Sequence, residues 1–406
     1  MGARYDAIVV GGGPSGATSA MLLASAGWRV CVVEKADFPR RKVCGEFISA
    51  TTWPLLREMG VADALKKIAG PPVRRIGVYA GEAMVTAALA RTNERAADDG
   101  RAVGREHLDT LLLRRAAEAG AEVRQPWAVS AFASHRGTYV CTIIDKNTRQ
   151  TLELQSPLII AAHGSWEPGA MPTQDFRRAW RDSDLFGFKA RFRHSSLPAD
   201  LMPLLAFRGG YGGMVHAGGD RVSLSCCIRR DELALCRQRS PHLKAGPAVL
   251  RHIESSCEGV ALALRSSSPD GSWLSSGPLR TGLRTFGREG IFAVGNAAAE
   301  AHPIVAEGIS MAIQSAKLLC ARLIALAQER ENLPCSAPVL DVIRAGYAMD
   351  WQRNFSRRMR IAAFFAHLFM RPGFTRIATG LLEGMPDLLT EGARWSGKTQ
   401  PIQTSQ

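Results

Sequence analysis

The amino-acid sequence predicts an α/β fold: a domain built on a parallel sheet, a second domain with a mostly antiparallel sheet, and a helical C-terminal region. Three observations lead to this prediction: a glycine-rich turn between a short apolar strand and a helix, a period-two alternation in the middle of the chain, and a helical apolar pattern towards its end. The 406 residues are 46% hydrophobic and 22% charged, which is ordinary for a globular protein of two or three domains.

The first 34 residues predict a strand–helix–strand unit. Residues 5–10 form a short apolar run, residues 11–16 a glycine-rich turn, residues 17–26 an alanine-rich helix and residues 29–33 a second apolar strand. Such a βαβ unit of about thirty residues is the start of a Rossmann-like domain.

The turn after the first strand has the pattern G-x-G-x-x-G, which predicts a dinucleotide site. Gly11 permits the tight turn, Gly13 lets a pyrophosphate approach the backbone, and Gly16 lets the helix pack against the strand. Pro14 and Ser15 begin the helix, whose free N–H groups and positive dipole end face the phosphates. Glu34, with Lys35 beside it, follows the second strand and suits a carboxylate that binds ribose hydroxyls. These residues alone do not choose between FAD and NAD.

The segments after the N-terminal unit are expected to complete the first domain and to form the antiparallel sheet and the C-terminal helices. Residues 54–68 and 106–119 have helical periodicity, and residues 186–193 and 222–229 alternate like half-buried antiparallel strands. In the first of these strands Lys189, Arg191 and Arg193 occupy the second face, interpreted as a solvated sheet face or the path of an acidic substrate. Residues 291–294 predict a strand, residues 308–327 a long helix, and the chain from Leu340 to about Arg394 is predicted to be helical before a polar tail.

Composition and charge narrow the class of protein. The nine cysteines contain no C-x-x-C pair and indicate reduced thiols in a cytoplasmic protein; Cys226 and Cys227 point to opposite faces of a strand, so no metal site is expected. No signal peptide and no uncharged membrane-spanning run are expected. The net charge of +14 is spread along the chain, so no nucleic-acid partner is predicted.

A basic amphipathic helix is predicted from about Asp350. Its arginines are Arg353, Arg357, Arg358 and Arg360, and its apolar residues recur at helical spacing over 361–369. Two interpretations stay open: a helix packed on the rest of the protein, and peripheral contact with the inner face of an anionic membrane.

Three stretches of residues 1–330 resemble the flavoprotein group of aromatic hydroxylases, geranylgeranyl reductases and flavin-dependent halogenases. They are the N-terminal unit, the segment Arg40-Arg41-Lys42-Val43-Cys44-Gly45-Glu46, which is similar to the group's R-x-K-x-C-G, and the segment Gly295-Asn296-Ala297-Ala298 with Pro303 and Glu307-Gly308-Ile309. The resemblance implies FAD as the cofactor.

The resemblance also implies roles for single residues. Arg41, Cys44 and Gly45 would lie along the flavin, Arg105 near the FAD phosphates, and Asn296 at the ribityl chain. Pro303, Gly308 and Ile309 would border the flavin, the last two through backbone N–H groups at a helix start.

The sequence departs from the group's pattern at several positions. Asn296 stands where the group usually has Asp, Ala306 replaces a usual glycine, and His163, in the segment Ala162-His163-Gly164-Ser165-Trp166, replaces an Asp associated with nicotinamide use. NAD(P)H is nevertheless the expected transient reductant.

The resemblance implies a division into domains. The FAD-binding domain would comprise residues 1–75, 100–175 and 280–330, the substrate domain residues 76–99 and 176–279, and the C-terminal helices residues 331–406.

Three functions are weighed for the whole chain. The first is an FAD-dependent monooxygenase that hydroxylates an aromatic or polyketide-like small molecule in secondary metabolism. It is favoured because the halogenase box W-x-W-x-I-P is absent and the reductase box Y-x-W-x-F-P is reduced to Tyr211-Gly212-Gly213-Met214-Val215-His216. The alternative is a reductase of a prenyl or polyene double bond, and the third is a basic binding protein without turnover.

Two residues are candidates for chemistry. His302, beside Pro303, is either a proton-transfer group or a histidine hydrogen-bonded to the backbone, and Cys44 is either a thiol in contact with flavin or substrate, or a small packed side chain.

Overall fold

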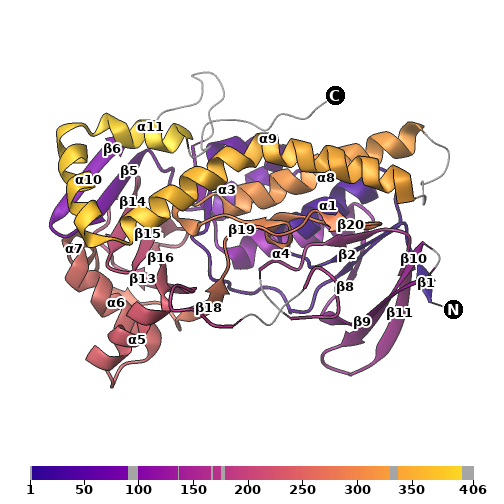
Figure 1. Cartoon of the computed structure of the whole chain (residues 1–406), viewed down its shortest axis with the longest axis horizontal. Helices are drawn as coiled ribbons and strands as arrows, with labels where there is room; N and C mark the ends of the chain where they lie inside the picture. Colours follow the sequence, from indigo (N-terminus) through magenta and orange to yellow (C-terminus); the bar gives the residue numbers. More distant parts are fainter. Residues whose placement is uncertain are drawn as a thin grey trace.

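The computed structural model describes residues 2–89, 99–135, 137–165, 168–174, 179–329 and 337–395. Trp166, Cys335 and the predicted polar tail beyond residue 395 lie outside these residues. Figure 1 shows an elongated molecule with a sheet at each end and a long C-terminal helix that runs along one side of both. The predicted α/β fold class is confirmed.

The first sheet has six strands and contains the predicted N-terminal unit. Its order is β20 (Gly287–Arg288), β21 (Ile291–Ala293), β12 (Ile159–Ala161), β2 (Ala7–Val10), β3 (Val30–Val33) and β8 (Glu122–Arg124). All neighbouring strands are parallel except β20, which is antiparallel to β21. The first strand of the predicted unit, β2, is therefore central in the sheet, as a Rossmann-like domain requires.

Different layers cover the two faces of this sheet. The helices α1 (Pro14–Ser25), α4 (Arg105–Glu118) and α8 (Gly308–Glu329) pack on one face with Ala7 and Val9, while Ile8 and Val10 face a second, four-stranded sheet. That sheet has the order β1 (Ala3–Arg4), β11 (Thr151–Ser156), β10 (Thr138–Asp145) and β9 (Trp127–His135). It was not foreseen as a separate layer.

The other end of the molecule is built on a sheet of ten strands. Its path is β17 (Ser268–Pro269), β13 (Leu185–Arg193), β16 (Arg221–Arg229), β15 (Gly210–Ala217), β14 (Leu201–Phe207), β5 (Arg75–Ala80) and β6 (Ala83–Ala88), with β18 (Leu274–Leu279), β4 (Phe47–Ile48) and β7 (Arg101–Ala102) off this path. Apart from the parallel pairs β14–β5 and β15–β7, the neighbours are antiparallel. The mostly antiparallel character is confirmed; the predicted domain boundaries stay a prediction.

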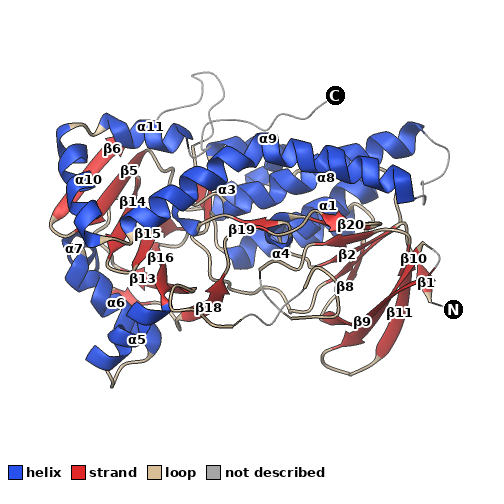
Figure 2. Cartoon of the chain, in the orientation of Figure 1, coloured by secondary structure: helices blue, strands red, loops and turns tan. Residues whose placement is uncertain are grey.

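Helices cover both faces of the ten-stranded sheet (Figure 2). On one face lie α5 (Arg230–Arg239), α6 (Ala245–Ser256) and α7 (Glu258–Leu264); on the other lie α9 (Ala337–Phe369), α10 (Pro372–Gly384) and α11 (Asp387–Trp395). Cys226 packs on the first face and Cys227 on the second, so the two side chains point apart as expected. Because both faces are covered, the interpretation of Lys189 and Arg191 as a solvated face is wrong: they are 1% and 5% exposed.

Two of the predicted helices differ clearly in their bounds. The segment 54–68 is two helices, α2 (Trp53–Glu58) and α3 (Ala62–Ile68), separated at Gly60, whose φ of +71° no helix accepts. The first long helix begins at Pro14 and not at residue 17, since proline is well accepted in the first helical turn. Helix α8 is long and apolar enough to cross a bilayer by composition, yet 67% of its most apolar window is buried inside the protein.

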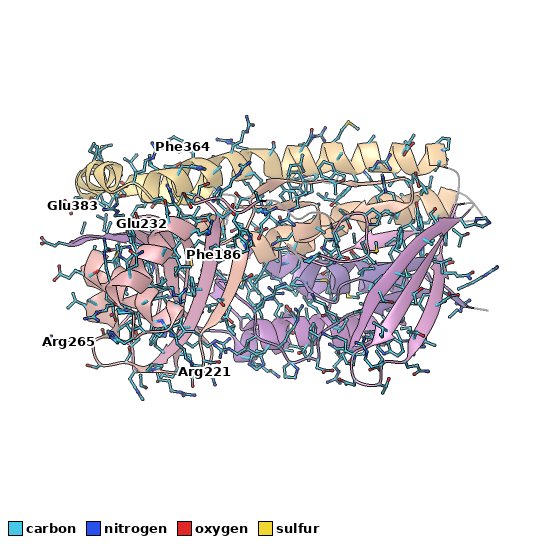
Figure 3. All side chains as sticks on the ribbon, turned by 60° about the horizontal axis from the view of Figure 1, so that its bottom comes forward. Phe186, Arg221, Glu232, Arg265, Phe364 and Glu383 are labelled. Carbon is cyan, nitrogen blue, oxygen red and sulfur yellow. The ribbon has the colours of Figure 1, made fainter. Side chains whose placement is uncertain are left out.

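The basic C-terminal helix is packed, and its arginines do not form one face. Arg353, Arg357 and Arg360 are exposed, whereas Arg358 is buried and donates to Gln314 at 3.3 Å. Phe369 is buried, while Phe364, labelled in Figure 3, is 62% exposed. Membrane contact through this helix stays a prediction.

Candidate functional site

The glycine turn after β2 can be formed only by glycine at two of its positions. Gly11 has a φ of +108°, and a Cβ on Gly16 would lie 1.8 Å from the carbonyl oxygen of Gly11. At Gly13 the situation is different, because a Cβ would meet only the guanidinium nitrogens of Arg105 and Arg40, at 3.8 and 3.9 Å. Gly13 therefore borders an open space that faces two cations.

The helix start adds further groups that attract an anion. Gly13 is the N-cap of α1 and no side chain caps the helix, so its first N–H groups and its positive dipole end face the same space. Arg105 is held by Asp109 through two hydrogen bonds of 2.7 Å. Arg40 lies 3.7 Å from both Asp109 and Glu34, and its buried Nε has no hydrogen-bond partner among the described residues. This combination suits a pyrophosphate.

Glu34 has the position expected of a ribose-binding carboxylate. It is 3% exposed at the end of β3, and its two oxygens accept hydrogen bonds from the N–H groups of Gly12 at 2.7 Å and Ala36 at 2.9 Å. Each carboxylate oxygen can accept a further hydrogen bond. Lys35, the next residue, is exposed.

The second predicted segment lies against the first. Gly295, at φ +59°, begins the 3₁₀ helix Gly295–Ala297, and a Cβ there would lie 2.6 Å from Oγ of Ser15 at the start of α1. The turn Pro303–Val305 then ends at Ala306, whose φ of +54° is the left-handed conformation that glycine adopts most easily. The departure from glycine at this position is thus tolerated without a change of backbone.

Gly308 and Ile309 begin α8 as expected. Ile309 is buried, while Gly308 is exposed and a Cβ on it would meet no atom within 4 Å. The preceding Glu307 accepts a hydrogen bond from Ser49 at 3.1 Å, which ties this helix start to the segment after Glu46. The N–H groups of the first helical turn have no acceptor within the helix and remain for a ligand.

Asn296 is oriented by two neighbours that were not predicted. Its Nδ2 donates to Oγ of Ser165 at 2.8 Å and to Oε1 of Glu300 at 3.3 Å. Glu300 also accepts hydrogen bonds from Ser165 and, at 2.6 Å, from Arg284. With its hydrogens used in this way, the amide presents its oxygen for a ribityl hydroxyl.

His163, which replaces the group's usual Asp, is held as a neutral ring. Burial, the largest influence, lowers its pKa to about 4. Its Nδ1 lies 3.2 Å from the carbonyl oxygen of Gly164 and its Nε2 lies 3.0 Å from Oγ1 of Thr173. We assign the proton to Nδ1, because a carbonyl oxygen can only accept.

Residues 41–46 run from the glycine turn towards the ten-stranded sheet. Cys44 is half-buried and its sulfur accepts a hydrogen bond from the N–H of Glu46; a Cβ on Gly45 would touch Oγ of Ser225 on β16. Between Arg41 and Cys44, burial and the charges of Arg105 and Arg40 lower the pKa of Lys42 to about 8. The amine of Lys42 can therefore change its protonation state in mildly alkaline solution.

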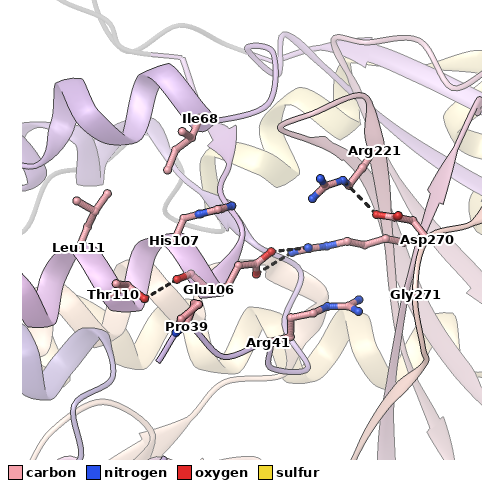
Figure 4. A pocket seen from close by; sticks show the side chains of 11 residues that line it. Pro39, Arg41, Ile68, Glu106, His107, Thr110, Leu111, Arg221, Asp270 and Gly271 are labelled. Atoms are coloured by element: carbon pink, nitrogen blue, oxygen red, sulfur yellow. Dashed lines mark hydrogen bonds and ion pairs between the residues drawn. The ribbon is translucent and has the colours of Figure 1, made fainter. Parts of the chain in front are cut away.

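The side chains of the neighbouring residues Arg40 and Arg41 point to different places. Arg40 faces the glycine turn, whereas Arg41 lines a pocket of about 640 Å³ between α4 and the ten-stranded sheet (Figure 4). Arg40, to which the sequence analysis gave no role, therefore joins Arg105 beside the glycine turn, and the flavin contact of Arg41 stays a prediction.

The strand residues Lys189 and Arg191 form a buried ionic cluster with two carboxylates. Glu46 pairs with both Lys189 and Arg191, and Glu106 pairs with Arg191. Although burial opposes ionisation, the hydrogen bonds from Arg191 lower the pKa of Glu106 to about 2. The cluster joins β13 to the segment that carries Cys44 and to the start of α4.

His302 lies under the C-terminal helix, next to the Pro303–Val305 turn. Its Nδ1 is 3.2 Å from the hydroxyl of Tyr211, its Nε2 is 2.9 Å from Oγ1 of Thr281, and its ring packs against His367 of α9. Burial, together with His367, lowers the pKa of His302 to about 4. Both hydrogen-bond partners are side chains and not the backbone that was expected; a role in proton transfer stays a prediction.

These features fit FAD at each point tested: an open backbone at Gly13, two cations beside it, a carboxylate at the strand end and a helix start at Gly308. Residues 4–173 match the family described as "FAD binding domain". The chain carries an FAD binding domain. For this domain, the resemblance to FAD-binding flavoproteins is confirmed.

Known proteins of several activities are similar to this chain. It is 26% identical over 378 residues to "Digeranylgeranylglycerophospholipid reductase 2" of Methanopyrus kandleri, covering 90% of this chain and 87% of the relative. Among solved structures, the flavin-dependent brominase Bmp2 has a TM-score of 0.75 at 17% identity, with 98% and 94% of the two chains covered. PqsL of Pseudomonas aeruginosa in complex with 2-aminobenzoylacetate has a TM-score of 0.73 at 17% identity, with 94% and 100% covered.

The likeness to these structures concerns the fold. The matched part of the chain spans less than two thirds of two further relatives, 64% of a receptor from Dictyostelium discoideum and 39% of a peptidyl-carrier protein chlorinase from Pseudomonas fluorescens.

The residues that sequence reasoning missed share one property. Arg40, Lys42, Asp109, Ser165 and Glu300 stand next to, or one helical turn from, residues that were predicted. Arg40 and Arg41 are adjacent in the chain and differ only in the direction in which their side chains point. The sequence pattern does not give this direction. For Asp109 a signal was present, since its spacing of four from Arg105 predicts a helical ion pair.

Proposed function

We propose that this protein is an FAD-dependent monooxygenase that hydroxylates an aromatic or polyketide-like small molecule, with NAD(P)H as the transient reductant. The observation that carries the proposal is an apolar layer that meets the Pro303–Val305 turn. It lies between the ten-stranded sheet and the C-terminal helices, and Ile304 of the turn is part of it.

The layer consists of side chains from four separate stretches of the chain, which belong to the ten-stranded sheet, the Pro303–Val305 turn and helix α9. Its buried members are Val78, Ala80, Leu185, Ala206, Tyr211, Cys227, Ile304, Ala362, Ala366 and Phe369. A surrounding of this kind excludes water and suits an apolar or aromatic substrate. FAD, when bound, supplies two-electron redox chemistry and the activation of oxygen. The protein therefore has mainly to bind and orient the substrate and to exclude water from the site.

The polar groups in this layer can orient a substrate hydroxyl. The hydroxyls of Tyr211 and Thr281 stand on either side of the His302 ring, and all three groups are neutral near pH 7, because burial raises the pKa of Tyr211 and lowers that of His302. Neutral donors and acceptors bind a phenol or ketone without introducing a charge into the apolar layer.

The alternative function, reduction of a prenyl or polyene double bond, is supported by a different observation. The digeranylgeranylglycerophospholipid reductase is similar over 90% of this chain, so its likeness extends beyond the FAD binding domain. An apolar layer would also suit a hydrocarbon chain.

A comparison of turnover with and without oxygen tests the proposal. The FAD-loaded protein is supplied with NADPH and either resorcinol, 1-naphthol or geranylgeraniol. Oxygen uptake that requires the phenol or naphthol, with one atom of ¹⁸O₂ found in the product, supports a monooxygenase. Saturation of geranylgeraniol under argon, with oxygen uptake independent of the aromatic compounds, overturns it in favour of the reductase.

A further inference from the structure

The pocket lined by Arg41 has more cations than its own carboxylates neutralise. Three arginines, Arg41, Arg191 and Arg221, line it together with two carboxylates, Glu106 and Asp270 (Figure 4). Arg191 pairs with Glu106, and Arg221 lies 3.1 Å from Asp270. Asp270 is shared further, because Arg193 donates to it at 3.2 Å.

Arg41 has no carboxylate of its own in this arrangement. Its Nη1 lies at 3.5 Å from the carbonyl oxygen of Ser272, which is the limit of a hydrogen bond. Its Nε and Nη2 are buried and have no hydrogen-bond partner within the part of the chain that the structure describes. Arg41 as a whole is partly buried, but these two guanidinium nitrogens are shielded from water without a partner, so an anionic ligand would gain charge-assisted hydrogen bonds at this position.

The wall of the pocket keeps room for this guanidinium. Gly271 has a φ of +86°, and a Cβ on it would lie 3.0 Å from Nη1 of Arg41. The remaining lining combines apolar side chains, Ile68, Leu111 and Pro39, with the exposed ring of His107. A surface of this kind suits a flat ring attached to a charged group.

The pocket adjoins the FAD phosphate position but is separate from it. Arg105 and Asp109 of α4 face the glycine turn, whereas Glu106, His107 and Thr110 of the same helix face the pocket. The consecutive residues Arg40 and Arg41 likewise lie on opposite sides. A ligand in the pocket would therefore lie beside bound FAD without displacing it.

We propose that this pocket is the docking site of the nicotinamide dinucleotide that reduces the FAD, with Arg41 binding its phosphate groups. The assignment rests on the proposed use of NAD(P)H. A volume of about 640 Å³ holds part of such a dinucleotide, with the base or nicotinamide ring against the apolar wall. The same phosphate chemistry is present in a substrate carried on coenzyme A, so the test has to separate the two sources.

The test uses calorimetric titration of the FAD-loaded, oxidised protein with NADP⁺, NAD⁺, inorganic pyrophosphate and coenzyme A. We expect one of the two nicotinamide nucleotides to bind, pyrophosphate to compete with it, and Arg41→Met to weaken its affinity about tenfold or more. Because no turnover is involved, failure of the monooxygenase proposal leaves this result unaffected.

Two variants act as matched controls. Arg40→Met removes the neighbouring arginine and should weaken FAD binding while leaving the nucleotide affinity of the FAD-saturated protein within about twofold. Arg114→Met removes a cation from the outer side of α4, where it pairs with Glu118, and should change neither affinity. The thermal unfolding temperatures of all three variants are compared with that of the wild type, to separate loss of binding from loss of folding.

Three outcomes would overturn the proposal. They are wild-type nucleotide affinity in Arg41→Met, nucleotide binding that Arg40→Met and Arg41→Met weaken equally, and binding of coenzyme A but of neither nicotinamide nucleotide in a manner that depends on Arg41. The last outcome would assign the pocket to a phosphate-bearing substrate.

Discussion

Two groups of basic residues in this protein are similar in composition but differ in whether a ligand can reach them. At the glycine turn, Arg40 and Arg105 border an open space at Gly13, and Arg40 retains a buried nitrogen without a partner among the described residues. In the ten-stranded sheet, Lys189 and Arg191 are held by Glu46 and Glu106. Carboxylates stand beside the cations in both groups, so the difference lies in the open space at Gly13, which leaves the cations of the glycine turn accessible to a ligand.

The largest effect is expected where the glycine turn itself is broken. Gly16→Ala would place a Cβ 1.8 Å from a backbone oxygen, so the turn has to move, FAD binding is lost and the free energy of unfolding falls by more than about 4 kcal/mol. FAD content by absorbance and urea unfolding measure both effects.

Gly13→Ala is the matched control for this change. Its Cβ would meet nothing closer than 3.8 Å, so the stability of the FAD-free protein should stay within about 1 kcal/mol of the wild type while FAD affinity falls at least about tenfold. Equal loss of stability in both variants would contradict the open space at Gly13.

The second prediction breaks the ionic cluster of the sheet. Glu46→Gln leaves Lys189 and Arg191 buried with less negative charge, and we expect the free energy of unfolding to fall by about 3–5 kcal/mol. Urea unfolding measures the change. Glu118→Gln, at an exposed ion pair, should leave the midpoint unchanged; a similar loss in both variants would show that burial of the cluster is unimportant.

The third prediction concerns the pH dependence of stability that two buried histidines cause, His163 near Asn296 and His302 beneath helix α9. His163 and His302 both have a pKa of about 4 in the folded protein against 6.5 when unfolded, so the unfolded state binds more protons between these values. Stability should therefore fall as the pH drops from about 6.5 to about 4, by at most about 3 kcal/mol for each histidine.

Urea unfolding at pH 7 and pH 5 measures this loss. His163→Asn and His302→Asn should each remove part of the pH dependence, and the two parts should add because the residues lie in different regions. Unchanged pH dependence in either variant would show that its ring is not held neutral.

The smallest effect is expected at Ala306. Its left-handed φ of +54° is easier for glycine, so Ala306→Gly should raise the free energy of unfolding by about 0.5–1 kcal/mol. Differential scanning calorimetry can resolve such a shift. A decrease in stability would show that the methyl group contributes more by packing than its conformation costs.

The sequence by itself determined the FAD binding domain and the main helices and strands. The turn of Gly11, Gly13 and Gly16, the acid at Glu34 and the helix start at Gly308 are local features, in which the residue type and the backbone conformation are directly linked. The period of two likewise identified β13 and β16 without knowledge of their neighbours.

Only the tertiary structure decided what the polar residues contact. Whether Lys189 and Arg191 meet solvent, whether Arg40 or Arg41 faces the glycine turn, and which residues hold Asn296 all depend on segments far apart in the chain. Alternation gives the two faces of a strand, but the element that covers each face comes from elsewhere in the sequence. The charge balance around a side chain, and hence its capacity to bind a ligand, is a property of that packing.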